Sequence, residues 1–196
     1  MSQIKKNQLL TLIFVSISLL SGCTQLLVVA HGDRVADQNH GKRTFGALIE
    51  DHSIERKSLI NIKNLAPELK GSHIEITSYN GTVLIAGQTD SKKSKLKAKG
   101  IVQKIRHVNR VYNAMEIAGP SSLLVRLNDS WITFKVKLAL TSGKNTPSNR
   151  TKIVTENSIV YLMGLLNRKE ENAIIEKIRG VRGAQKIIKL TEYIRS

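Results

Sequence analysis

Cys23 is the residue of this sequence whose type and position point most directly to covalent chemistry. It follows the small residues Ser21-Gly22 and an apolar run, Leu9–Leu20, which lies behind a pair of lysines. This order is typical of a secretory signal peptide that is cleaved on export. The apolar run has 12 residues, whereas a helix that spans a bilayer needs about 20. We therefore predict a signal peptide over residues 1–22.

The segment Leu20–Cys23 resembles the lipobox of bacterial lipoproteins. In that class the cysteine sulfur receives diacylglycerol, the signal is cut before the cysteine, and the new amine is acylated. The resemblance therefore implies an S-diacylglycerol group and an N-palmitoyl group on Cys23. Because one acyl chain anchors only marginally, three chains should hold the protein on a membrane almost permanently. Thr24 stands where an Asp commonly retains such proteins in the inner membrane, so the resemblance favours the periplasmic face of the outer membrane.

Cys23 is also the only cysteine, and the lipid would consume its sulfur. The folded part then has no disulfide, no thiolate nucleophile and no thiolate metal ligand. The five histidines are scattered, without the spacing of a metal site. We find no Ser/His/Asp set, phosphate-binding loop or nucleotide-binding glycine pattern. We expect a protein that is not an enzyme and that uses no cofactor or metal.

The charge of the chain favours an anionic partner. The sequence has 31 Lys and Arg against 15 Asp and Glu, and removal of Lys5 and Lys6 with the signal peptide leaves a net charge of +14. Such a surplus attracts nucleic acid, anionic lipid headgroups or lipopolysaccharide. Because export removes nucleic acid from reach, we expect anionic lipid and no nucleic acid.

The remainder of the chain contains an internal repeat. Asn80–Gly87 aligns with Asn157–Gly164, 77 positions later, and Asp51–Ile54 aligns with Asp129–Ile132, 78 positions later. A third pair of segments, which begins at Lys104 and at Lys177, aligns at an offset of 73. The offset falls by about one helical turn. Two copies of one unit therefore follow each other, with one helix shorter in the second copy.

Each copy shows the same order of helix and strand patterns. In the first copy we expect a helix at Ser53–Leu65 behind a cap at Asp51 or Ser53, strands at His73–Tyr79 and Thr82–Gln88, a helix from Asp90 to about Arg106 and a strand at Val111–Ile117. In the second copy we expect a helix at Ser130–Thr141, strands at Thr151–Glu156 and Ser158–Leu166, a helix at Arg168–Arg179 and a strand at Ala184–Tyr193. The fold class is α+β, with two α-β-β-α-β units. Each unit should place two helices on one face of a three-stranded sheet. Gly87 and Gly164 end equivalent hairpins, where close packing or a bulge is expected.

The doubled α-β-β-α-β order resembles the tandem BON domains of the DolP (YraP) outer-membrane lipoproteins, a family with members labelled 21 kDa haemolysin. The resemblance rests on the two hairpins, Tyr79–Gln88 and Val154–Leu165, and on the run Asn128–Val136. It implies a lipidated tether at 23–48, a first BON domain at 49–119, a linker at 120–126 and a second BON domain at 127–195.

The first helix of the second copy carries two apolar stripes. At about 100° per residue, one stripe should face the sheet; it contains Ile132, Val136, Ala139 and Leu140. The other lies almost opposite and contains Trp131, Phe134 and Leu138, with Lys135 and Lys137 on its flanks. Because a helix in a small domain needs one buried stripe, the second stripe needs another cover.

A bilayer is one such cover, since a Trp ring suits the headgroup level and lysines reach toward phosphates. DolP proteins bind anionic phospholipid through the equivalent helix, so the resemblance points to the same residues. The stripe could instead pack against the other BON domain or against Leu123-Leu124-Val125. We predict phospholipid binding, to phosphatidylglycerol or cardiolipin, by Trp131, Phe134, Lys135, Lys137 and Leu138.

A second candidate surface is a basic strip on the last helix of the first copy. Its members are Lys92, Lys93, Lys95, Lys97 and Lys99. Each lysine near a charged leaflet would contribute about 1 kcal/mol. The alternative is an ordinary solvated helix face.

These observations predict an outer-membrane lipoprotein that binds anionic phospholipid through its second BON domain and supports envelope integrity. The family resemblance extends this role to the division site. Two alternatives stay open, a membrane-active haemolysin and a periplasmic adaptor that binds envelope proteins.

Overall fold

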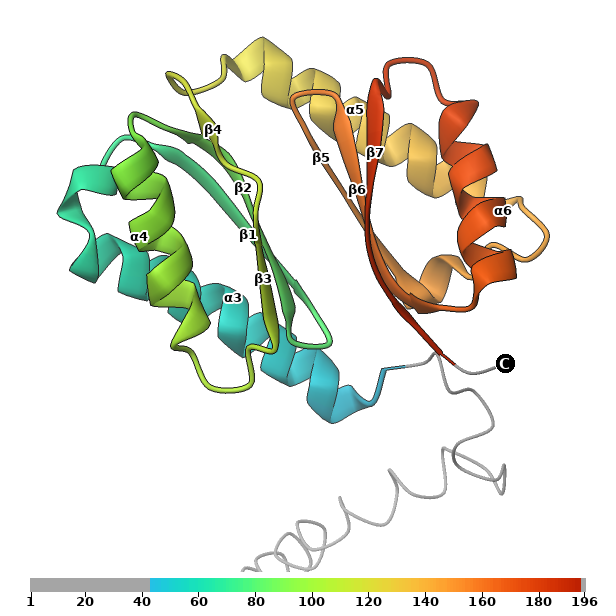
Figure 1. Cartoon of the computed structure of the whole chain (residues 1–196). Coiled ribbons are helices and arrows are strands. Elements are labelled where there is room, and N and C mark those ends of the chain that lie inside the picture. The colour runs from blue at the N-terminus through green and yellow to red at the C-terminus, as the bar shows by residue number, and fades with distance from the viewer. Residues whose placement is uncertain (1–42, 195–196) are drawn as a thin grey trace, which may run out of the picture. The chain divides into compact units, whose positions relative to one another are not determined.

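A computed structural model describes residues 43–194 of the chain. The predicted signal peptide, the lipid on Cys23 and the tether up to residue 42 lie outside the described residues. Within this range the chain forms four α-helices and seven β-strands (Figure 1).

The first unit has the predicted α-β-β-α-β order. Its elements are α3 (Phe45–Leu65), a short 3₁₀ turn (Pro67–Leu69), β1 (His73–Tyr79), β2 (Thr82–Thr89), α4 (Lys92–Gln103), β3 (Arg110–Asn113) and β4 (Glu116–Ile117). β1 pairs antiparallel with β2, while β3 and β4 both pair parallel with β2, at opposite ends of it. The strand predicted at Val111–Ile117 is thus interrupted at Ala114-Met115, where the Met115 amide donates a hydrogen bond to the Asn113 side-chain oxygen at 3.2 Å.

The second unit repeats this order with a continuous third strand. Its elements are α5 (Leu123–Thr141), a 3₁₀ turn (Ser148–Arg150), β5 (Thr151–Glu156), β6 (Ile159–Leu166), α6 (Arg168–Arg179) and β7 (Lys186–Tyr193). The strand order is β5-β6-β7, with β5 antiparallel and β7 parallel to β6. The predicted fold class is confirmed for both units.

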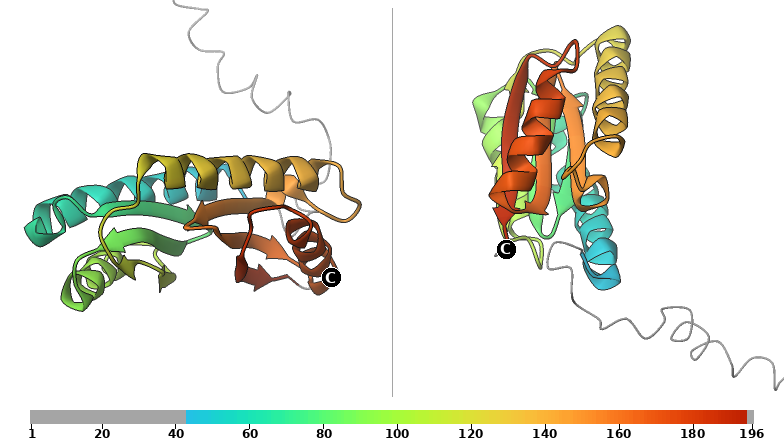
Figure 2. Two further views of the ribbon diagram at one scale, coloured as in Figure 1. Left: turned by 90° about the horizontal axis from the view of Figure 1, so that it is seen from above. Right: turned by 90° about the vertical axis from the view of Figure 1, so that its right-hand side faces the viewer.

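In each unit, two helices pack on one face of the sheet (Figures 1 and 2). In the first unit, Ile54 and Ile62 of α3 and Val102 of α4 meet Val83 and Ile85 of β2 in one apolar cluster. In the second, the equivalent cluster contains Ile132, Val136, Leu140, Ile153, Val160, Leu162, Ile174 and Ile178. These residues recur every three or four positions in the helices and every second position in the strands, which places them on single faces.

The alternate residues of the strands form a third apolar cluster, in which the two sheets pack on each other. It contains Tyr79, Leu84, Ala86, Val154, Tyr161, Met163 and Leu190. Polar contacts surround it: the Tyr79 hydroxyl donates to the Arg150 carbonyl oxygen at 2.6 Å, and Gln88 donates to Glu156 at 2.7 Å. β2 is therefore buried along its whole length, since helices cover one of its faces and the other sheet covers the second.

Helix α3 begins eight residues before the start predicted from the sequence. The expected cap at Asp51 or Ser53 is wrong: Thr44 is the N-cap, and its hydroxyl accepts a hydrogen bond from the Ala47 amide at 3.1 Å. Asp51 lies buried in the middle of the helix. The residues predicted as the end of the tether therefore form the first turn of α3.

Helix α5 also begins earlier than predicted, at Leu123. Ser122 is its N-cap, and the Ser122 hydroxyl accepts from the Val125 amide at 3.4 Å. Most of the predicted linker at 120–126 is thus helix, because a serine followed by helix-forming residues provides the start. Helix α4 deviates less: Ser91 caps it in place of Asp90, and it ends at Gln103.

The predicted close packing at Gly87 and Gly164 is confirmed. A β-carbon on Gly87 would lie 2.1 Å from the His73 carbonyl oxygen, and one on Gly164 would lie 2.8 Å from the Arg150 carbonyl oxygen. Because these glycines have no β-carbon, the neighbouring strand of each hairpin can approach closely.

A buried carboxylate in the first helix of each unit binds the tip of the hairpin. Asp51 accepts hydrogen bonds from the Asn80 and Gly81 amides and the Ser78 hydroxyl, at 2.7–3.0 Å, and from Arg43 at 2.6 Å. Burial alone would raise the pKa of Asp51, but the hydrogen bonds together hold it below its ordinary value. Asp129, its counterpart in the repeat, accepts from the Asn157 and Ser158 amides, both at 2.8 Å.

We predict that Asp51→Asn lowers the free energy of unfolding by about 2–3 kcal/mol at neutral pH, because an amide accepts fewer of these hydrogen bonds. The lowered pKa means that the contribution of Asp51 is present above the ordinary value of 3.8 and is lost as the pH falls through the folded value. The difference between wild type and variant in urea denaturation should therefore narrow as the pH falls below 3.8.

Glu176→Gln is the matched control. Glu176 forms an exposed ion pair with Arg179 within one helix, so its loss should change stability by less than about 1 kcal/mol. A stability difference for Asp51→Asn that stays constant on acidification would contradict this role of the carboxylate.

Candidate membrane-contact site

Helix α5 has one buried face and one exposed apolar face. Ile132, Val136 and Leu140 are buried against the sheet. On the opposite face, Trp131 is 58% exposed and Leu138 is 59% exposed. The structure thus places the predicted second stripe in solvent. In the described residues the stripe does not pack against the other domain, because the two domains contact each other through their sheets.

The exposed stripe is longer than the sequence indicated. Leu124 and Leu127 precede Trp131 by seven and four residues on the same helical face, and both are exposed. Both residues precede the helix start predicted from the sequence, whereas Ser122 is the capping residue that signals the true start. We call Leu124, Leu127, Trp131, Phe134 and Leu138 the α5 stripe.

The two aromatic rings of the α5 stripe stack on each other. Their centroids are 5.3 Å apart and their planes differ by 17°. Such offset stacking of residues one turn apart holds both rings in one orientation. Because the indole also has an N–H donor, the pair offers an apolar surface with a polar edge, which suits the headgroup level of a bilayer.

The two lysines predicted beside the stripe have different surroundings. The Lys135 ammonium donates to the Arg182 carbonyl oxygen at 2.5 Å and is partly buried. Lys137 is exposed and lines a cleft of about 500 Å³, together with Arg126 and Lys152. Lys137 is therefore better placed than Lys135 to meet an anionic group beside the stripe, whereas the exposed Arg126 guanidinium also donates to the Ser121 carbonyl oxygen, at 3.0 and 3.2 Å.

The predicted basic strip of α4 is partly occupied by contacts within the protein. The Lys95 ammonium donates to the Met115 carbonyl oxygen at 2.5 Å, and Lys97 forms an ion pair with Glu68 at 2.7 Å. Lys92 and Lys93 are exposed, while Lys99 is partly buried. The five lysines do not act as one free cationic row.

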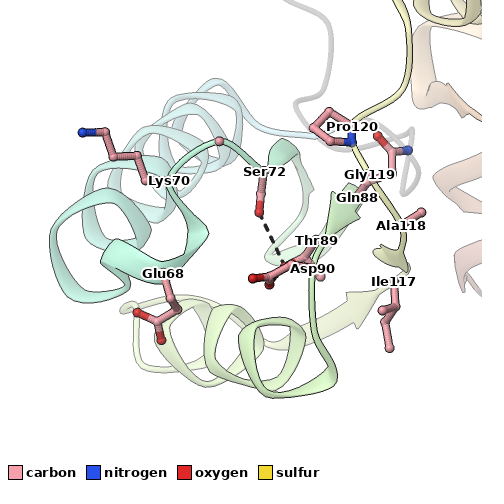
Figure 3. A pocket seen from close by; sticks show the side chains of 11 residues that line it. Glu68, Lys70, Ser72, Gln88, Thr89, Asp90, Ile117, Ala118, Gly119 and Pro120 are labelled. Carbon is pink, nitrogen blue, oxygen red and sulfur yellow. Dashed lines mark hydrogen bonds between the residues drawn. The ribbon is translucent and has the colours of Figure 1, made fainter.

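A cleft of about 420 Å³ lies at one end of the first sheet, between the 3₁₀ turn and the residues after β4 (Figure 3). Three of its polar residues bond to one another: the Ser72 hydroxyl lies 3.5 Å from the Thr89 hydroxyl, and Thr89 donates to Asp90 at 3.3 Å. A hydrogen bond from Ser94 lowers the pKa of Asp90. The cleft therefore contains loop-stabilising contacts and offers no nucleophile paired with a base.

Tyr161 is an ionisable side chain that lies buried between the two sheets. Burial between the sheets raises the pKa of Tyr161 to about 12, and the Glu116 and Glu156 carboxylates add to the effect. The phenol is therefore protonated at neutral pH. Within residues 43–194, no group of three His, Cys, Asp or Glu side chains is arranged to hold a metal ion. None of the described helices combines the length and apolar character that a bilayer-crossing helix requires.

The described residues form two tandem α-β-β-α-β units, and the second unit keeps a stacked aromatic pair in solvent. The BON domain family matches residues 51–119 and 128–195. The chain therefore belongs to the BON-domain family, as the repeat predicted.

Named relatives cover most of the chain. It is 29% identical over 164 residues to the 21 kDa hemolysin of Actinobacillus pleuropneumoniae, an alignment that covers 84% of each chain. It is 28% identical over 175 residues to the outer membrane lipoprotein DolP of Haemophilus influenzae, which covers 89% of this chain and 90% of DolP. The C-terminal domain of CdsD, a type III secretion protein of Chlamydia trachomatis, aligns with a TM-score of 0.30 at 14% identity, over 74% of this chain and 67% of that one.

The exposure of Trp131 gives a direct test of the site. Because Trp131 is the only tryptophan, acrylamide quenching of the lipid-free protein reports on this position alone. We expect strong quenching of the folded protein, close to that of the protein in urea. Quenching that rises steeply on unfolding would mean that another surface covers the stripe.

Proposed function

We propose that this protein is an outer-membrane lipoprotein that binds anionic phospholipid through the α5 stripe and thereby supports envelope integrity. The observation that carries the proposal is the pair Trp131–Phe134, stacked and exposed on the helix that also carries Lys137 and Arg126. The apolar rings and leucines would enter the bilayer to the acyl boundary. The cations would meet phosphatidylglycerol or cardiolipin headgroups.

Cys23 supplies the permanent attachment in this proposal. Its lipobox-like context and the similarity to an outer membrane lipoprotein over 89% of the chain support lipidation and a periplasmic location. The lipid anchor fixes the protein to a membrane but does not select one lipid. Selectivity would come from the α5 stripe and its cations, and the division site is a region where such selectivity would act.

A second candidate function comes from the relative named 21 kDa hemolysin. A membrane-active protein would use the same exposed stripe, and lysis of red cells by the protein tests it. An adaptor function, in which an envelope protein covers the stripe, predicts no binding to protein-free vesicles.

The test of lipid binding uses the chain from residue 23 onward with Cys23→Ser, so that no acyl chain contributes. This protein should float with phosphatidylglycerol vesicles and remain in solution with phosphatidylcholine vesicles. Leu138→Glu should weaken binding to the anionic vesicles at least about tenfold, because a buried leucine contributes about 1.5–3 kcal/mol and the new carboxylate is repelled.

Leu96→Glu is the matched control, since Leu96 of α4 is 58% exposed and Leu138 is 59% exposed. Binding that is unchanged by Leu138→Glu but lost in Leu96→Glu would move the lipid site to the basic strip of α4. Failure of the unsubstituted chain to bind anionic vesicles would contradict the proposed function.

A further inference from the structure

Helix α3 of the first domain also keeps apolar side chains in solvent. Phe45 is 76% exposed and Ile49 is 53% exposed, and Leu59 and Ile60 further along the helix are exposed too. Ile49 follows Phe45 by four residues and Ile60 follows Phe45 by fifteen. This spacing places all three on one helical face, opposite the buried Ile54. Large apolar side chains that gather on one exposed face mark an interaction site.

The charges on α3 make this face suitable for an anionic partner. Arg56, Lys57 and Lys63 are exposed, and none forms a salt bridge with another described residue. The three acidic residues of the helix already form hydrogen bonds or ion pairs within the protein. Asp51 binds the hairpin, Glu50 pairs with His107 at 3.1 Å, and Glu55 pairs with Lys152 at 2.6 Å.

The ion pair between Glu55 and Lys152 connects α3 to β5 of the second domain. Lys152 belongs to β5, the strand on which α5 packs, and Thr133 of α5 bonds to Thr155 of β5 at 2.8 Å. The partner of Lys152, Glu55, belongs to α3. The edge strands β1 and β5 thus lie next to each other. Helix α3 packs on β1 and helix α5 packs on β5, and the cleft that contains Lys137 lies between the two strands.

The position of α3 in the chain adds a second argument. The helix begins at Phe45, and 21 residues separate Cys23 from it. A chain of that length spans at most about 75 Å, which limits the distance between the start of α3 and the anchored cysteine. Phe45 belongs to the described element nearest to the anchor along the chain.

We propose that the exposed face of α3, formed by Phe45, Ile49, Arg56, Ile60 and Lys63, is a second contact with the same anionic bilayer. The inference rests on the proposed function, because it extends the α5 contact to the first domain. The protein would then bind with both domains against the lipid. The lipid anchor, α3 and α5 would act as three linked contacts, and linked contacts raise the overall affinity without any change in each one.

Site-specific fluorescence tests this proposal. Because Cys23 is the only cysteine, the chain from residue 23 with Cys23→Ser has no thiol. Ile49→Cys, Leu138→Cys and Leu96→Cys then each accept one environment-sensitive NBD label at an exposed position. With phosphatidylglycerol vesicles, labels at 49 and 138 should shift to the blue and brighten, while the label at 96 should stay in water.

The outcomes separate the two proposals. A label at 138 that enters the bilayer while the label at 49 stays in water would overturn the α3 contact and leave the α5 contact standing. A label at 138 that stays in water would overturn the α5 contact itself. Phe45→Cys provides a second label on α3 if the protein labelled at residue 49 does not fold.

Binding strength gives an independent readout. Phe45→Glu combined with Ile49→Glu should weaken binding to phosphatidylglycerol vesicles at least about tenfold, since two apolar side chains leave the bilayer and two negative charges face it. The matched control is Leu96→Glu combined with Ile117→Glu, because both residues are exposed apolar positions of the same domain. Equal weakening by the two pairs would show a general charge effect and contradict the α3 contact.

Discussion

The burial of one sheet against the other is the interaction on which the rest of this structure depends. Each unit of about 70 residues is small enough that its own core stabilises it only marginally. Leu84, Ala86, Tyr161 and Met163 are almost fully buried in the cluster between the sheets. Side chains as large as Leu and Met contribute about 1.5–3 kcal/mol each when they leave water. The two domains therefore support each other, and both faces of β2 must be apolar.

The same interaction determines which surface is left for function. Because the inner face of each sheet is covered by the other sheet, and the outer face by the helices, the outermost surfaces belong to α3, α4, α5 and α6 in the described residues. A buried aspartate in the middle of α3 and another in α5 bind the hairpin tips. This fixes each helix on its sheet, so that its outer face has a defined orientation. The α5 stripe is exposed as a consequence of packing and not of local disorder.

Much of this architecture could be predicted from the sequence. The repeat of Asn80–Gly87 in Asn157–Gly164 gave both hairpins, and the period of Ile132, Val136 and Leu140 gave the buried face of α5. Helix starts were harder to predict. Thr44 and Ser122 are ordinary capping residues, and the apolar residues after them face solvent. The first turns of α3 and α5 therefore lack the periodic pattern of buried apolar residues from which a helix is predicted. Asp51 resembled a cap because Asp is common at helix starts, whereas its partners lie about 30 residues away in the hairpin.

The candidate site could be predicted only in part, for a related reason. Trp131, Phe134 and Leu138 were identified because they form a second apolar stripe on a helix that needs only one buried stripe. The engagement of Lys135 with the Arg182 carbonyl oxygen depends on a loop 47 residues later, and the exposed face of α3 depends on a helix start that the sequence analysis placed too late. Long-range contacts of this kind leave no periodic signal.

Quenching of Trp131 by brominated phospholipid tests most directly whether the α5 stripe contacts a bilayer. With anionic vesicles whose acyl chains carry bromine near the headgroup, we expect Trp131 emission to be strongly quenched when the protein without its lipid anchor binds. Vesicles of brominated phosphatidylcholine alone should leave the emission unchanged. If the protein binds the anionic vesicles and Trp131 is not quenched, the α5 stripe does not contact the bilayer and the proposed lipid site is wrong.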